Sequence, residues 1–319
     1  MSSSWIFDNV FEAVHHLDPA NPLYEAKKRD CALFRNNNST SIMMNDGTWV
    51  TMPMHFDMRI YRGENTVYET CKAGLYRIKD TDLRCCLDVK RCDFELYVLE
   101  MEEIKQRIET GQRVDTLAIA QHYGFPTRML DVTKDLIVAA FFATHRFNSS
   151  NGQIEPVEAG TGRIRWGVEI SEFYIYQSLQ IFGDQMFERP HSQDAMGVVL
   201  SEEDDFSNHG GYIDFYQSKE MTEVFDRYVD GEMIIPQPEY ISMVATYILK
   251  SCAVSSMAIE RYLQESGEDY NKVANIVKKQ GLYIVDAPLL HPSITLPVPV
   301  NDLQMMPIRT ERITPTFII

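Results

Sequence analysis

An arginine followed directly by glycine stands in the stretch Ile60-Tyr61-Arg62-Gly63-Glu64, where a short strand over residues 58–61 is expected to end. Arginine offers a planar set of N–H donors that suits a phosphate or a carboxylate. Glycine lets a ligand approach the backbone closely. We therefore expect Arg62 to hold a free guanidinium beside exposed backbone. A surface position or an ion pair is the commoner role for an arginine at a strand end, and that alternative stays open.

A second polar block runs from Gln121 to Asp135, between two apolar segments. Its order is a helix, then Gly-Phe-Pro-Thr-Arg, then Leu-Asp-Val-Thr, which predicts a turn that presents side chains into a cleft. Structural roles are also open for its members. Asp131 or Thr133 would cap a helix that begins near Lys134, and His122 would be a core histidine bonded to a carbonyl.

The elements that position these blocks follow from the spacing of apolar residues. The first block is followed by two predicted helices, which Gly111 and then Gly124 with Pro126 bring to an end. The second block leads through a short strand into a buried helix of Ala and Phe. The resulting mixture, without regular alternation of strand and helix, predicts an α+β fold. The expected helices cover residues 5–17, 93–110, 115–123, 136–147, 257–265 and 271–279; the strands cover 129–132, 163–176, 231–235, 281–285 and 308–319; residues 36–41 are expected to form a loop.

Composition limits the class of protein. The 319 residues suit one large domain or two joined ones. No apolar run approaches the roughly 20 residues that a membrane helix needs, and the start of the chain lacks the pattern of a secretory signal. We therefore expect a cytoplasmic protein without membrane partners.

Charge and cysteine content narrow the chemistry further. The formal net charge of −16 disfavours non-specific binding of nucleic acid. None of the six cysteines forms a CxxC pair, so we expect free thiols and no metal site. The acidic run over residues 202–205 is interpreted as a solvated loop.

Taken together, the two blocks resemble the FRG domain family. That family is named for an N-terminal Phe- or Tyr-Arg-Gly, here Tyr61-Arg62-Gly63. Its second motif is similar to the block from Gln121 to Thr133, followed by an Ala- and Phe-rich helix. A late Gln-Gly-aromatic motif resembles Gln280-Gly281-Leu282-Tyr283. The resemblance implies an FRG domain over residues 51–319, with core motifs between 58 and 285, after an N-terminal helical segment of residues 1–50.

A weaker resemblance links the chain to ADP-ribosyltransferases of the Arg-Ser-Glu class. It implies a split β-sheet core with helical insertions, and NAD as substrate. By this resemblance Arg62 binds NAD, Thr133 supports the nicotinamide, and Gln280 stands where those enzymes have a catalytic Glu. The catalytic residues implied are Arg62, His122, Asp131 and Gln280; those implied to bind the cofactor are Arg62, Gly63, Thr127, Arg128 and Thr133.

Three functions are compatible with these residues. The first is an ADP-ribosyltransferase-like enzyme, such as a toxin, that modifies a protein or nucleic acid. The second is an NAD glycohydrolase, with water as the acceptor. The third is a non-catalytic module that senses a nucleotide or binds a partner, which the neutral Gln280 favours because an amide cannot offset developing positive charge. A hydrolytic nuclease has the least support, since His122 and Asp131 lack a metal cluster.

Overall fold

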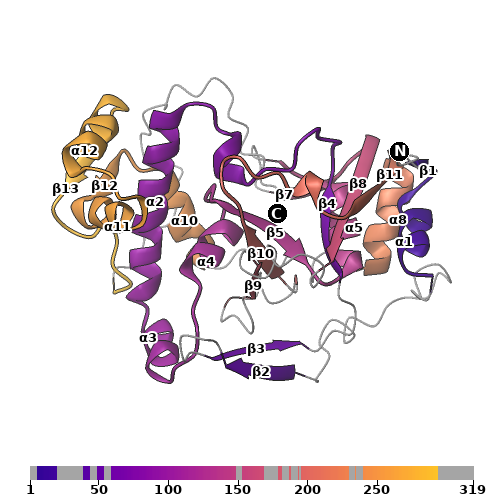
Figure 1. Ribbon diagram of the computed structural model, residues 1–319, viewed down its shortest axis with the longest axis horizontal. Helices are drawn as coiled ribbons and strands as arrows, with labels where there is room; N and C mark the ends of the chain where they lie inside the picture. The colour runs from indigo at the N-terminus through magenta and orange to yellow at the C-terminus, as the bar shows by residue number, and fades with distance from the viewer. Residues whose placement is uncertain are drawn as a thin grey trace.

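The computed structural model describes residues 6–19, 39–43, 49–53, 59–148, 153–168, 179–181, 187, 193, 195–229, 234 and 240–293. A mixed seven-stranded sheet lies on one side of the molecule, and a group of helices around α2 lies on the other (Figure 1). The strand order in the sheet is β1-β11-β8-β4-β5-β10-β9. β1 and β11 are parallel, and the other neighbours are antiparallel. The strands are β1 (Ile6–Phe7), β4 (Arg59–Glu64), β5 (Met129–Thr133), β8 (Ala159–Val168), β9 (Leu179–Ile181), β10 (Ala195–Val199) and β11 (Gly211–Ser218).

The sheet is divided at its centre. β4 pairs with β8 from Arg59 to Glu64, along its whole length. On its other side, β4 pairs with β5 through the single residue pair Tyr61 and Thr133. The sheet therefore consists of the parts β1-β11-β8-β4 and β5-β10-β9. Three two-stranded sheets accompany it: β2 (Ser39–Met43) with β3 (Trp49–Pro53), β6 (His145–Asn148) with β7 (Gln153–Pro156), and β12 (Ala253–Ser255) with β13 (Tyr283–Val285).

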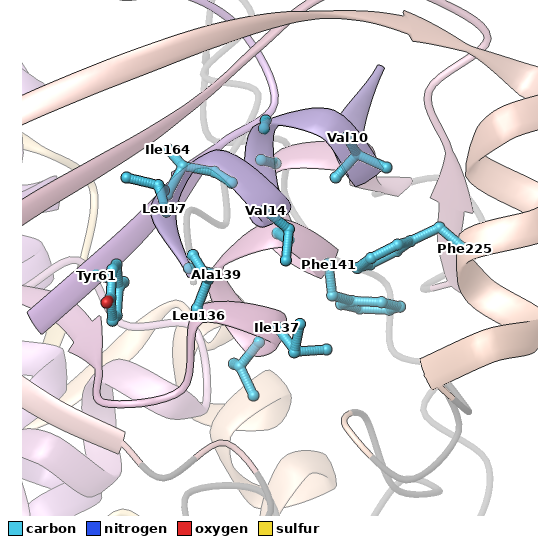
Figure 2. Packing of buried hydrophobic residues seen from close by; sticks show 14 of the residues in the cluster. Val10, Val14, Leu17, Tyr61, Leu136, Ile137, Ala139, Phe141, Ile164 and Phe225 are labelled. Atoms are coloured by element: carbon cyan, nitrogen blue, oxygen red, sulfur yellow. The ribbon is translucent and has the colours of Figure 1, made fainter. Parts of the chain in front are cut away.

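Helix α5 (Leu136–Thr144) forms the core on one face of the sheet. Its sequence is apolar on every side, as expected for a helix that is covered all round. Asp135 caps it by accepting a hydrogen bond from the Ile137 N–H. Tyr61 of β4, Val14 of α1 (Val10–Leu17) and Phe225 of α8 (Lys219–Val229) belong to the same buried cluster as α5 (Figure 2). The described N-terminal residues thus share their core with β4 and α5.

The opposite side of the molecule is organised by the long helix α2. It begins after Asp80, whose carboxylate accepts from the N–H groups of Asp82 and Leu83. Two further buried clusters form on it, one with α4 and α10, the other with α11, α12 and β13. No helix among the described residues is both long and apolar enough to span a membrane. These helices are α2 (Thr81–Leu99), α3 (Glu102–Glu109), α4 (Thr116–His122), α10 (Tyr240–Lys250), α11 (Ser256–Ser266) and α12 (Tyr270–Lys279); short 3-10 turns are η3 (Gly74–Arg77) and η4 (Phe206–Asn208).

The predicted α+β class is confirmed, whereas the ADP-ribosyltransferase-like arrangement and the domain boundary at residue 51 stay predictions. The single helix predicted over residues 93–110 is wrong: α2 begins at Thr81, and the chain turns at Met101, whose ψ is 133°, before α3. The loop predicted over 36–41 is also wrong in its described part, where β2 begins at Ser39. The strand predicted over 308–319, most of the one over 231–235, and residues 169–176 lie outside the described residues.

Candidate functional site

A small polar cavity lies where the two parts of the sheet meet, beside α5. It has a volume of about 20 Å³, which is room for one water molecule. Its walls come from β4, from the end of α4, from β5, from α5, and from the residues just before β10. The residues that carry the argument below are Arg62, Gly63, His122, Asp131, Thr133 and Gln193, and all six line this cavity.

Arg62 is not the free guanidinium that the sequence predicts. Only 2% of the residue is exposed, and its Nη1 donates to the carbonyl oxygen of Asp131 at 2.7 Å. Its Nε faces Glu64 Oε1 at 3.9 Å, while Glu64 Oε2 accepts from Arg165 Nε at 2.9 Å. The bond to Asp131 joins β4 to β5 next to their one residue pair, so Arg62 holds the two parts of the sheet together. Its predicted role in binding NAD stays a prediction.

Gly63 is required by packing. A Cβ atom at this position would lie 1.9 Å from the Ala139 carbonyl oxygen and 2.7 Å from the Ala143 nitrogen, both in the backbone of α5. The helix thus crosses β4 in direct contact with the glycine. Our expectation that this glycine leaves space for a ligand is wrong at the Cβ side, because α5 already fills that space.

The side chain of Asp131 is held by other members of the polar block. Gln121 Nε2 donates to Asp131 Oδ2 at 3.2 Å, and Thr127 Oγ1 donates to Gln121 Oε1. Thr127 Oγ1 also accepts from the Met129 N–H at 3.0 Å, which fixes the turn before β5. Thr127 is fully buried, so its role in the structure is to orient Gln121. Its predicted contact with a cofactor stays a prediction.

Thr133 connects β5 to the chain before β10. Its Oγ1 donates to the Gln193 carbonyl oxygen at 2.9 Å and accepts from the Asp135 N–H at 3.0 Å. The cap of α5 is Asp135, so the alternative that Asp131 or Thr133 caps this helix is wrong. His122, 2% exposed at the end of α4, completes the polar side of the cavity.

Most of the cavity residues lie within a part of the chain that matches a family model. Residues 57–152 match the model of the FRG domain family. The chain contains an FRG domain. Neither a curated protein nor a solved structure gave a significant match to the chain. The matched residues include Arg62, His122, Asp131 and Thr133. Gln193 and Gln280 lie beyond them.

Two predicted residues do not join the others. Arg128 lies among the lining of a separate pocket between α2, α4 and α11. Gln280 is the residue that ends α12, and the strand after it pairs with β12 outside the seven-stranded sheet. Neither lines the cavity. The roles that the resemblance implies for Arg128 and Gln280 stay predictions.

Gln193 is the residue that sequence reasoning missed. It stands two residues before β10, which pairs with β5 so that Ala195 lies opposite Thr133. Its side chain is 2% exposed, and its Oε1 is buried without a hydrogen-bond donor among the described residues. Nε2 donates to the Ile234 carbonyl oxygen at 3.3 Å. The available signal was a glutamine two residues before Ala195-Met-Gly-Val-Val199, a run without charged residues that ends in two valines, which favour strands.

The cavity combines acceptors with a buried acid. Asp131 is the one carboxylate among the described lining residues, and the Gln193 amide oxygen is a neutral acceptor. Such a pair suits hydroxyl donors of a sugar. Burial raises the pKa of the Cys71 thiol to about 12, although the nearby positive charge of Arg62 acts to lower it. The thiol stays protonated near neutral pH and is therefore a poor nucleophile.

Proposed function

We propose that the FRG domain is an ADP-ribosyltransferase-like enzyme that takes NAD as its substrate at the cavity between β4, β5 and β10. The observation that carries this proposal is the order of residues across three neighbouring strands. Arg62 lies on β4, Thr133 on β5 directly before the Ala- and Phe-rich α5, and Gln193 before β10. This is the order that the resemblance to ADP-ribosyltransferases implies, with Gln193 in the place first given to Gln280.

The polar groups fit a ribose, but the enclosed volume does not fit NAD. Asp131 and Gln193 present oxygen acceptors, which hydroxyl groups require. A volume of about 20 Å³ admits one water molecule. Binding of NAD therefore requires the wall to open, and Phe142 of α5 is the one partly buried residue among the described lining residues. We derive no reaction step from the closed form.

The residues of the chain have distinct tasks in this proposal. Asp131 supplies the negative charge that the neutral Gln193 lacks, and Gln121 keeps that carboxylate in position. Thr133 fixes the backbone of Gln193. NAD would supply the ADP-ribosyl group through its bond to nicotinamide. The acceptor, a protein or a nucleic acid, is not specified by these residues.

The test is incubation of the purified chain with NAD labelled in its adenine, in the presence of cell lysate. Label on a macromolecule supports transfer, free labelled ADP-ribose supports an NAD glycohydrolase, and intact bound NAD supports a non-catalytic sensing module. Failure of NAD to bind at all refutes the proposal for this site.

A matched pair of variants locates the activity. Asp131→Asn keeps an acceptor for Gln121 but removes the charge, so turnover should fall by about 100-fold, in the range of one lost electrostatic contact. Asp214→Asn is the control, because Asp214 is 7% exposed, close to the 6% of Asp131, but pairs with Arg163 on β8, away from the cavity. An equal loss of NAD turnover in both variants would mean that Asp131 affects activity only by stabilising the fold.

A further inference from the structure

A second, larger pocket lies between α2, the chain leading into α4, the turn at Arg128, and α11. Its volume is about 250 Å³. Its charged lining side chains are four arginines and three acids: Arg91, Arg113, Arg128, Arg261, Glu95, Asp115 and Glu265. None of these residues lines the small cavity described above. The pocket is therefore a separate polar site.

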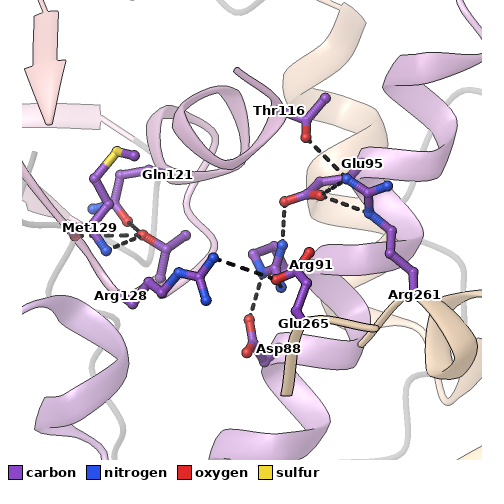
Figure 3. A network of polar contacts seen from close by, with 10 residues as sticks. Asp88, Arg91, Glu95, Thr116, Gln121, Arg128, Met129, Arg261 and Glu265 are labelled. Carbon is purple, nitrogen blue, oxygen red and sulfur yellow. Dashed lines mark hydrogen bonds and ion pairs between the residues drawn. The ribbon is translucent and has the colours of Figure 1, made fainter. Parts of the chain in front are cut away.

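Two of these arginines, Arg91 and Arg261, have structural roles. Arg91, 2% exposed at its side chain, binds Asp88 at 2.5 Å, Glu265 Oε2 at 2.8 Å and Glu95 (Figure 3). Arg261 donates from Nε to Glu95 Oε2 at 2.9 Å. Because Glu95 is buried, these bonds satisfy its charge and join α2 to α11.

Arg128 differs from these two. Its side chain is 43% exposed, and its nearest carboxylate is Glu265 Oε2 at 3.8 Å, beyond hydrogen-bond distance. Within the part of the chain that the structure describes, its guanidinium forms no hydrogen bond. Figure 3 shows it directed at Glu265, which already binds Arg91. A donor-rich guanidinium thus faces a pocket of ligand size whose floor is a buried, fixed ion-pair network.

We propose that this pocket binds a sugar phosphate, with Arg128 as the principal donor to its phosphate. An arginine fork suits phosphate oxygens. Two acids of the lining, Glu265 and Asp115, would repel a bare anion, but they accept hydrogen bonds from the hydroxyl groups of a sugar. The volume likewise exceeds that of a phosphate ion alone. This proposal does not depend on NAD as substrate. It gives Arg128 a different ligand from the NAD that the resemblance implies, and the pocket contains none of the other residues assigned to that reaction.

The test is calorimetric titration of the full chain with ribose 5-phosphate, and separately with inorganic phosphate and ribose. We expect ribose 5-phosphate to bind most tightly of the three. Arg128→Gln should weaken its binding about 10-fold or more, the loss expected when a charged donor is removed. Arg227→Gln, an exposed arginine on α8, is the matched control and should change it by less than about twofold.

A third variant separates a ligand site from a structural ion-pair network. Glu265→Gln removes the carboxylate that competes for Arg128, so ribose 5-phosphate should bind more tightly to it than to the wild type. Arg91 keeps Asp88 and Glu95, so the variant should still fold. Binding weaker than about 10 mM for the wild type, or equal binding by the Arg128→Gln and Arg227→Gln variants, would overturn the proposal.

Discussion

Replacing Gly63 with alanine tests whether this glycine serves packing or a ligand. The added Cβ would lie 1.9 Å from the Ala139 carbonyl oxygen and 2.7 Å from the Ala143 nitrogen. These two atoms stand four residues apart in α5, where one helical hydrogen bond joins such groups. A normal carbon–oxygen contact needs more than 1 Å of additional separation. Since α5 is buried between the sheet, α1 and α8, it has little room to retreat.

The expected cost is at least about 3 kcal/mol, the upper end of the usual range for overpacking. For a chain of 319 residues that lowers the melting temperature by roughly 4–5 °C. Gly167→Ala is the control, because its Cβ would meet Phe206 and Ile60 at 3.5 and 3.6 Å, which is ordinary contact. Thermal melting followed by circular dichroism compares the two. If Gly63→Ala melts like the control but no longer binds NAD, the glycine serves a ligand and the packing argument fails.

Two further substitutions test buried charges. Arg62→Ala should lower the unfolding free energy by about 3 kcal/mol, because it removes a charge-assisted bond between β4 and β5 and leaves a cavity. Denaturant unfolding measures this change. A midpoint equal to that of the wild type would show that Arg62 does not join the two parts of the sheet. Burial raises the pKa of Asp93, which bonds Ser255, to about 6. Its protonated form is therefore favoured in the folded state, and this stabilisation is complete below about pH 4 and lost as the pH rises through 6. Between about pH 4 and pH 6, the unfolding free energy of the wild type should therefore fall by about 3 kcal/mol relative to that of Asp93→Asn. If the unfolding free energies of the two proteins change with pH in parallel, the raised pKa of Asp93 is contradicted.

The elements that sequence reasoning predicted well are those with local signals. Helices α11 and α12 lie within one residue of their predicted limits, because Ser255 and Asp269 cap their starts and Gly267 ends α11 in a left-handed conformation. β5 lies within one residue of its predicted limits. The all-apolar helix α5 begins at its predicted residue but ends at Thr144, because the chain continues as the strand β6 from His145.

The part of α2 before residue 93 was missed for a nonlocal reason. Lys90, Arg91 and Glu95 interrupt its apolar pattern, yet each is only 1% exposed. Lys90 donates to carbonyl oxygens of Leu249 and Ser251, and burial lowers its pKa to about 8. These partners lie about 160 residues away in the chain, so no local window shows that the charges are satisfied. Arg62 was misjudged for the same reason, since its partner is the backbone of a strand that follows much later.

The sequence pointed to Gln280 rather than Gln193 because a Gln-Gly pair before a strand also occurs where a helix ends. Glutamine and glycine before a strand marked Gln280, but the same residues end a helix: Gln280 closes α12, and Gly281 has a φ of 79°. We expect Gln193→Glu to raise NAD turnover, because the added carboxylate lies in the cavity, whereas Gln280→Glu leaves turnover unchanged. Burial raises the pKa of such a glutamate, so the melting temperature of the Gln193→Glu variant should also fall as the pH rises, independently of NAD. Turnover that responds to Gln280→Glu but not to Gln193→Glu would place the site at α12 and refute the one proposed between β4, β5 and β10.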